Sequence, residues 1–133
     1  MIDAATRLLV RQHAGNRCEY CRLPQSASPF LTFHIEHIQA SQHVRDDDPS
    51  NLCLACPHCN LNKGPNLSSV DPKTRETVDL FHPRRQNWHD HFQLDGARIE
   101  GKTLTGEVTA RLLKINDEEH LEIRTGLILR GEY

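Results

Sequence analysis

The sequence predicts a small α+β fold whose amino-terminal half is held together by a metal site. Two Cys-x-x-Cys elements, Cys18/Cys21 and Cys56/Cys59, provide the ligands. A strand signal lies between them, a short helix signal follows them, and hairpin and helix signals fill the second half. With 133 residues, 37% apolar and 26% charged, we expect one domain, or one domain with an appendage, and no stretch able to span a bilayer.

The two cysteine pairs predict a structural zinc site. Four thiolates in two close pairs can close a tetrahedral shell around Zn²⁺, because each x-x turn puts both sulfurs on one side of a tight loop. Two disulfides are the alternative, but Cys53 makes the cysteine count odd, and the first residues contain no apolar signal segment. We therefore expect zinc, a cytoplasmic location, and Cys53 as an ordinary buried thiol.

The size and charge of the chain support a structural metal. A core of about seventy residues is too small and too polar to fold robustly on apolar burial alone, so zinc has a stabilising task there. The formal charge of −2 gives no general electrostatic attraction for nucleic acid, so any such contact must be local.

The first elements are a helix and a strand. Asp3 is a good cap for a helix over 4–13, and Gly15 marks its end. The aromatic and β-branched run 30–35 predicts a strand that ends at Glu36-His37-Ile38. Polar candidate residues therefore stand at the end of a strand.

A loop, a second strand and a short helix come next. Residues 39–50 are mostly polar and predict a loop, and the apolar run 52–55 can pair back as a strand. Pro57 suits the first position of a helix over 57–63, which Gly64 ends. This frame places the helix opposite the strand that ends in Glu36-His37.

The residues on these two elements suit a second kind of metal. Glu36 offers a carboxylate, and Asn60 offers a carboxamide oxygen from the short helix. Such hard oxygen ligands, completed by water, fit Mg²⁺ or Mn²⁺ better than Zn²⁺. The sequence therefore predicts two different metals.

These motifs together resemble the HNH endonuclease family in its four-cysteine zinc form. The resemblance covers about residues 15–66, and it is carried by Glu36-His37-Ile38, Asn51-Leu52, Cys56-Pro57-His58-Cys59-Asn60 and Lys63-Gly64. It implies a ββα-metal (His-Me finger) fold and a nuclease that leaves 5′-phosphate and 3′-hydroxyl ends.

The resemblance also implies roles for individual residues. His37 would be the general base, because a neutral imidazole can take a proton from water close to physiological pH. Asn51 would orient the catalytic loop, and Glu36 and Asn60 would hold the divalent cation. The family often has His where this chain has Asn60, and His58 lies close by in the sequence.

Three basic residues are candidates for contact with nucleic acid. Lys63, on the short helix, can meet a backbone phosphate or can be a solvated lysine at the helix end. Arg84 and Arg85 precede Trp88, and arginines beside an aromatic ring can grip a nucleic-acid backbone. The alternative is that Trp88 fills a small core while both arginines are solvated.

The second half, 67–133, is predicted as a small α+β extension that packs on a core of residues 1–66. Residues 91–94 and 97–100 flank Asp95-Gly96 and predict a hairpin. Thr105 can cap a helix over 106–113, and Asp117 can cap a final helix. A helical turn is expected near Asp71-Pro72.

We therefore expect an HNH-type endonuclease or nickase that acts on DNA. The sequence leaves RNA open as a substrate, and it leaves the oligomeric state open. A zinc-stabilised module that binds nucleic acid or protein without catalysis is the alternative, although such a module needs only the cysteines and has no use for Glu36, His37 and Asn60.

Overall fold

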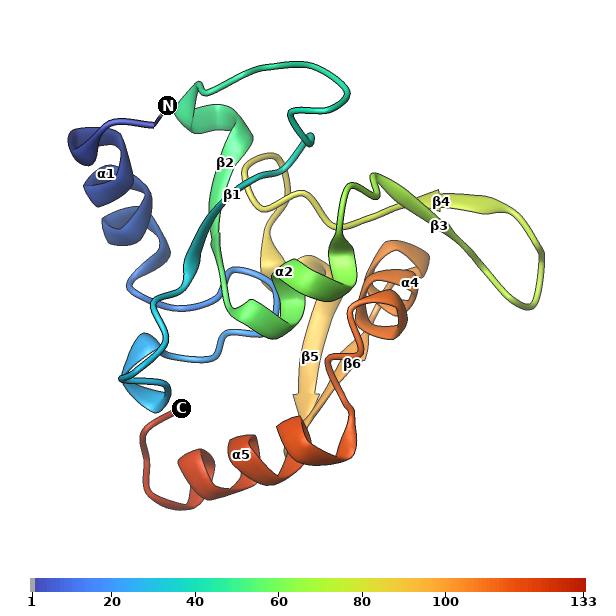
Figure 1. Ribbon diagram of the computed structural model, residues 1–133. Helices are drawn as coiled ribbons and strands as arrows, with labels where there is room; N and C mark the ends of the chain where they lie inside the picture. Colours follow the sequence, from blue (N-terminus) through green and yellow to red (C-terminus); the bar gives the residue numbers. More distant parts are fainter. Residues whose placement is uncertain (1) are drawn as a thin grey trace.

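The computed structural model describes residues 2–133 and has a mixed α+β fold, as the sequence predicts (Figure 1). The five helices of this part of the chain are α1 (Ala4–Ala14), α2 (Pro57–Lys63), α3 (Trp88–His91), α4 (Leu104–Leu112) and α5 (Glu118–Leu129). Its strands are β1 (His34–His37), β2 (Leu52–Ala55), β3 (Ser68–Val70), β4 (Thr77–Asp79), β5 (Phe92–Asp95) and β6 (Arg98–Gly101). They pair as three antiparallel hairpins, β1–β2, β3–β4 and β5–β6.

Helix α1 has the predicted ends. The side chain of Asp3 accepts a hydrogen bond from the backbone N–H of Thr6 at 2.7 Å, which satisfies one of the free donors of the first turn. Gly15 ends the helix in the left-handed conformation, with φ of 63°. Val10 and Ala14 are buried and pack the helix against the β1–β2 hairpin.

Strand β2 is as predicted, but β1 is shorter than predicted. The strand begins at His34 rather than at Phe30, whose side chain is 97% exposed. The reason is the length of the partner: β2 offers only four residues, because a 3-10 turn ends at Asn51 and Cys56 already caps the next helix. In this register Glu36 lies opposite Cys53.

Helix α2 spans the predicted residues and packs against both strands of the first hairpin. Pro57 occupies the first turn, and the side chain of Cys56 accepts a hydrogen bond from the N–H of Cys59 at 3.4 Å. Gly64 ends the helix with φ of 53° and donates its N–H to the carbonyl of Asn60. The order β1, loop, β2, α2 is the compact frame that the sequence predicts.

The β3–β4 hairpin was not predicted and replaces the helical turn expected near Asp71. It projects from the body of the molecule (Figure 1). The Asp71 carboxylate accepts hydrogen bonds from the backbone of Lys73 and Thr74 and from the Thr74 hydroxyl, so it stabilises a tight turn instead of capping a helix. Arg75 completes the turn with φ of 63°.

The predicted hairpin and two helices of the second half are present, with shifted ends. The turn of the β5–β6 hairpin is Gly96-Ala97, one residue later than expected. Helix α4 starts earlier, because Thr103, not Thr105, accepts the hydrogen bond from the N–H of Gly106. A Cβ atom at Gly106 would lie 2.0 Å from the carbonyl oxygen of His91, so only glycine permits this approach of α4.

Helix α5 begins after Asp117, as predicted. The side chain of Asp117 accepts a hydrogen bond from the N–H of His120. Its buried side chains are Arg124 and Leu127. The Arg124 guanidinium donates to the carbonyls of Ala97 and Ile115, which ties α5 to the β5–β6 hairpin. The charged side chain of Arg124 therefore helps to hold α5 against the β5–β6 hairpin.

One apolar core receives side chains from both halves of the chain. Trp88 stacks on Phe92 and donates its indole N–H to the carbonyl of Tyr20 at 2.8 Å. The two halves of the chain share this core. The predicted boundary between a core of residues 1–66 and an extension of residues 67–133 stays a prediction. Within residues 2–133, no helix combines the length and the apolar character needed to cross a membrane.

Candidate functional site

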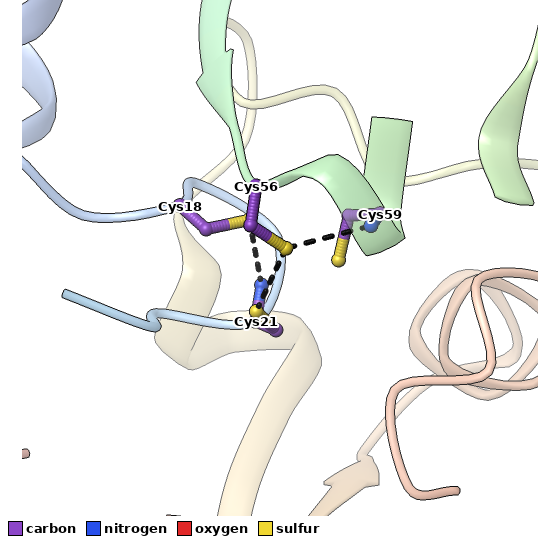
Figure 2. Close-up of side chains that lie close together, drawn as sticks. All are labelled: Cys18, Cys21, Cys56 and Cys59. Carbon is purple, nitrogen blue, oxygen red and sulfur yellow. Dashed lines mark hydrogen bonds between the residues drawn. The ribbon is translucent and has the colours of Figure 1, made fainter. Parts of the chain in front are cut away.

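The four predicted zinc ligands come together in one buried cluster (Figure 2). The sulfurs of Cys18, Cys21, Cys56 and Cys59 all lie within 4.8 Å of one another, and all four residues are free thiols. The first pair comes from the loop after α1, and the second pair from the start of α2. The cluster therefore joins segments that are far apart in the sequence.

This cluster fits a zinc ion. A tetrahedral shell with Zn–S bonds of about 2.3 Å has sulfur–sulfur edges of about 3.8 Å. The sulfurs of Cys21 and Cys56 are 3.8 Å apart. Hydrogen bonds from Cys18 and its neighbours lower the pKa of the Cys56 thiol, which favours the thiolate that a metal binds. The four cysteines thus suggest a structural zinc.

Cys56 has a second task in the same place. Its sulfur accepts the N–H of Cys59, and the sulfur of Cys18 accepts the N–H of Cys21 at 3.5 Å (Figure 2). Cys56 is also the residue that caps α2. Because Cys56 belongs both to the cysteine cluster and to the start of α2, the position of α2 depends on this cluster.

His37, at the end of β1, pairs with an aspartate from the loop that follows. Its Nε2 lies 2.7 Å from Oδ1 of Asp47, and the two side chains are 24% and 35% exposed. The hydrogen bond from His37 lowers the pKa of Asp47, so this carboxylate stays ionised near neutral pH. The pair fixes the imidazole ring and places a negative charge beside it.

Glu36, on the other face of β1, is buried with 8% exposure. Its Oε2 lies 3.8 Å from the sulfur of Cys53, the residue opposite it in β2. Burial raises the pKa of Glu36 from 4.5 to about 7, although the nearby Lys63 opposes this shift. The carboxyl group therefore changes its charge close to neutral pH.

Lys63 lies inside the protein, so the expectation of a solvated lysine at the helix end is wrong. The residue is 1% exposed. Its ammonium donates to the carbonyl of Ile38 at 3.0 Å and lies 3.6 Å from Oε1 of Glu36. Glu36 and Ile38 flank His37 in the sequence, so Lys63 stabilises the end of β1 through both neighbours of His37. A phosphate contact by Lys63 stays a prediction.

Asn51 is buried and makes three hydrogen bonds to the loop between β1 and β2. Its Oδ1 accepts from the N–H of Gln39 at 2.8 Å, and its Nδ2 donates to the carbonyls of Gln39 and Asp46 at 3.1 and 2.9 Å. These bonds tie the two ends of the loop together next to Asp47. The position is suited to the loop-orienting role that was predicted for Asn51.

An open cleft of about 480 Å³ lies between the end of β1 and α2. His37, Glu36 and Asn60 all line it, and His34 lines it as well. The cleft thus contains three of the four predicted catalytic residues. Asn51 lies outside its lining and acts on the site through the loop.

His58 lies away from the cleft, although it is two residues from Asn60. Its Nε2 lies 2.8 Å from the carbonyl of Lys114, and its ring stacks on the ring of His120 with centroids 3.7 Å apart. Of the two candidates on α2, Asn60 is therefore the one that faces the strand end.

The two arginines before Trp88 have different surroundings. Arg84 donates two hydrogen bonds to the Glu19 carboxylate, at 2.6 and 2.7 Å, and both side chains are largely buried. Glu19 also accepts the N–H of Leu54 at 2.8 Å, so this pair fastens 81–88 to β2. Arg84 is thus not solvated, whereas Arg85 is exposed. Nucleic-acid contact by either arginine stays a prediction.

Two partners of the site escaped the sequence reasoning. Asp47 belongs to the run Asp46-Asp47-Asp48, for which the sequence predicts only a polar loop. For Lys63 the sequence predicts only a phosphate contact or a solvated side chain. A carboxylate ten residues after a candidate base is a weak signal, because the loop conformation alone decides whether the two side chains meet.

Residues 18–66 match the family described as HNH endonuclease. The matching segment contains all four clustered cysteines, which fit the zinc type, together with the cleft residues of β1 and α2. The comparisons with curated proteins and with solved structures gave no match.

Proposed function

From the HNH endonuclease domain at residues 18–66, we propose that this protein is a metal-dependent endonuclease or nickase that hydrolyses phosphodiester bonds in DNA. The observation that carries the proposal is the cleft in which His37, held by Asp47, lies beside Glu36 and Asn60. A module that only binds would need the four cysteines but not this arrangement.

His37 acts as the general base. One ring nitrogen is occupied by Asp47 at 2.7 Å, so the other nitrogen takes the proton from the attacking water. The ionised Asp47 then stabilises the imidazolium that forms, in the way an aspartate supports a catalytic histidine in other hydrolases. Asn51 contributes by fixing the loop that carries Asp47.

Glu36 and Asn60 would hold a Mg²⁺ or Mn²⁺ ion in the cleft. The donor set fits, because a carboxylate and a carboxamide oxygen are hard ligands and both residues line the same space. A bound ion would supply Lewis-acid stabilisation of the charge that develops during hydrolysis of the phosphodiester. Lys63 keeps Glu36 and the backbone of Ile38 in place.

The nucleic-acid contacts in this proposal are local. Arg85 is exposed and lines a cleft with Gln39 and Asn51, close to the catalytic loop, so we assign it a backbone phosphate. Lys63 and Arg84 serve mainly inside the protein. Because the cysteines are free and not paired in disulfides, we place the protein in a reducing compartment such as the cytoplasm.

The test is cleavage of supercoiled plasmid by zinc-loaded protein with Mg²⁺, with Mn²⁺ and without added metal. We expect nicking or linearisation that requires the added metal and that falls by about 10²-fold or more in His37→Ala. His13→Ala, at an exposed position on α1, is the matched control and should cleave like the wild type.

Equal cleavage by His37→Ala and wild type would contradict the assignment of the base. Nucleic-acid binding without cleavage under any metal would favour the non-catalytic module. Cleavage of an RNA of the same sequence, but not of DNA, would overturn the choice of substrate.

A further inference from the structure

A second cluster of metal-ligating side chains lies where α2 meets the start of α5. One ring nitrogen each of His58 and His120 and one carboxylate oxygen of Asp117 lie within 4.8 Å of one another. His58 stands between two of the zinc-site cysteines, whereas the other two residues come from near the far end of the chain. The cluster is therefore assembled by the tertiary fold.

The atoms of this cluster are already in contact. Nδ1 of His120 lies 2.7 Å from Oδ1 of Asp117, and Nε2 of His58 lies 3.9 Å from Oδ2 of the same residue. The two imidazole rings stack with centroids 3.7 Å apart and an interplanar angle of 27°. The side chains of His58, His120 and Asp117 are 18%, 14% and 37% exposed, so an ion from solvent can reach them.

We propose that His58, Asp117 and His120 form a binding site for a transition-metal divalent cation such as Zn²⁺ or Co²⁺. Two imidazole nitrogens and one carboxylate oxygen are ligands that these ions prefer, and water completes the shell at a partly exposed position. The site is separate from the four-cysteine cluster and from the cleft, and it does not depend on the proposed nuclease activity.

Binding of one ion requires the side chains to move, because the stacked rings of His58 and His120 direct their nitrogen lone pairs alongside one another and must tilt apart. Ligand bonds of about 2.0–2.1 Å in a tetrahedral shell place the ligand atoms about 3.3 Å apart. The 2.7 Å contact of His120 reaches Oδ1 of Asp117 and the 3.9 Å contact of His58 reaches Oδ2, so the carboxylate must turn until one oxygen lies about 3.3 Å from both nitrogens. Binding through Nε2 of His58 replaces its hydrogen bond to the carbonyl of Lys114, and the ring proton moves to Nδ1, so the Asn62 amide nitrogen, 3.4 Å from Nδ1, must move away.

A metal at this position would join α2 to α5. The same ion would bind a residue of the zinc-site helix and two residues at the start of the last helix. Because a ligand that binds only the folded state raises stability, metal at this site should raise the Tm of the whole chain.

The test adds Co²⁺ to the full chain with zinc retained at the cysteines, and counts bound cobalt by equilibrium dialysis and elemental analysis. With Mg²⁺ in excess to occupy the cleft, we expect one Co²⁺ per chain, with visible d–d absorption but no thiolate-to-metal charge-transfer band, and a higher Tm. His120→Ala should weaken binding by at least about tenfold, and so should Asp117→Asn, which keeps the helix cap. His89→Ala, at an exposed histidine on α3, is the control and should bind like the wild type.

Three outcomes would overturn the proposal. The first is no cobalt bound beyond the four-cysteine site. The second is cobalt that appears only together with the charge-transfer band, which would place it at the cysteines. The third is equal affinity in wild type, His120→Ala and Asp117→Asn, each shown to be folded by circular dichroism.

Discussion

The ammonium of Lys63 lies 3.6 Å from the carboxylate of Glu36, and both side chains are buried. Lys63 belongs to α2 and Glu36 to β1, so this ion pair joins the two elements that form the cleft. Lys63 also donates to the carbonyl of Ile38, so it contacts the residues on both sides of His37 in the sequence. The energetics of this pair lead to the first two predictions.

Replacing Lys63 with Met should destabilise the protein near pH 7.5. The change removes the donor of the buried Ile38 carbonyl and the cation beside Glu36, whose carboxyl is then protonated in the folded state, so the free energy of unfolding should fall by about 1–3 kcal/mol. The measurement is urea denaturation of zinc-loaded protein, with Lys73→Met on the exposed hairpin as control. The double variant Lys63→Met/Glu36→Gln should recover most of the loss, and a double variant no better than the single one would contradict the pairing.

The ionisation of Glu36 should make stability fall as the pH rises. Burial raises the pKa of Glu36 from 4.5 to about 7, so between these values the folded state binds a proton that the unfolded state has lost. The stabilisation is complete below about pH 4.5 and is lost as the pH passes 7, a change on the order of 3 kcal/mol. The side chain introduced by Glu36→Gln cannot ionise. The free energy of unfolding of Glu36→Gln minus that of the wild type should therefore increase between pH 5 and 7.5, measured without added Mg²⁺ or Mn²⁺. A constant difference between the two proteins would exclude the raised pKa.

Asp47→Asn should lower cleavage while leaving the fold intact. The variant keeps the size of the side chain but removes the charge that holds and stabilises the His37 ring, so we expect a loss of about 10²-fold in the cleavage rate. Binding of plasmid, measured without divalent metal, should change little. Asp48→Asn is the matched control, because Asp48 only caps the 3-10 turn before β2. Equal rates for the two variants would show that Asp47 has no special part.

Arg84→Gln and Arg85→Gln should fail in different ways. Loss of Arg84 leaves the buried Glu19 unpaired, so the free energy of unfolding should fall by about 3 kcal/mol. Loss of Arg85 should leave stability unchanged, weaken DNA binding, and reduce the salt dependence of binding by about one phosphate contact. Denaturation and fluorescence anisotropy on the same two variants decide between the structural and the binding role of each arginine.

Removal of zinc should unfold the amino-terminal half. The four cysteines hold the segment after α1 against the start of α2, and a core of this size has little other stabilisation. A strong chelator should therefore remove much of the far-ultraviolet circular dichroism, and zinc should restore it. A spectrum that does not change while elemental analysis shows the metal gone would contradict a structural zinc.

Local signals were enough to predict the parts of the fold that depend on neighbouring residues. Helix α2 was predicted from Pro57 and Gly64, and α1 from Asp3 and Gly15, because caps act within one turn of the chain. The zinc ligands were equally clear, since the Cys-x-x-Cys spacing already brings each pair of sulfurs together. The structure confirms these elements.

Long-range contacts were not predictable in this way. Nothing near Lys63 in the sequence indicates that its ammonium turns inward to Glu36, and nothing near Asp47 indicates that it meets His37. The β3–β4 hairpin was missed because its strands are only three residues long and its turn starts with Asp71-Pro72, a pair that also begins helices. Each of these features depends on which distant segment the chain folds against.

The double role of Cys56 has a consequence for how activity would be controlled. The residue belongs to the four-cysteine cluster and also caps α2, whose Asn60 lines the cleft together with His37. In a chain without zinc, α2 would therefore not form one side of the cleft. Such a chain would be inactive, not merely slower. Zinc supply should set how many molecules are competent, and a competent molecule should work at full speed whatever the supply, so that titrating zinc changes the burst amplitude in a single-turnover assay but not its rate constant.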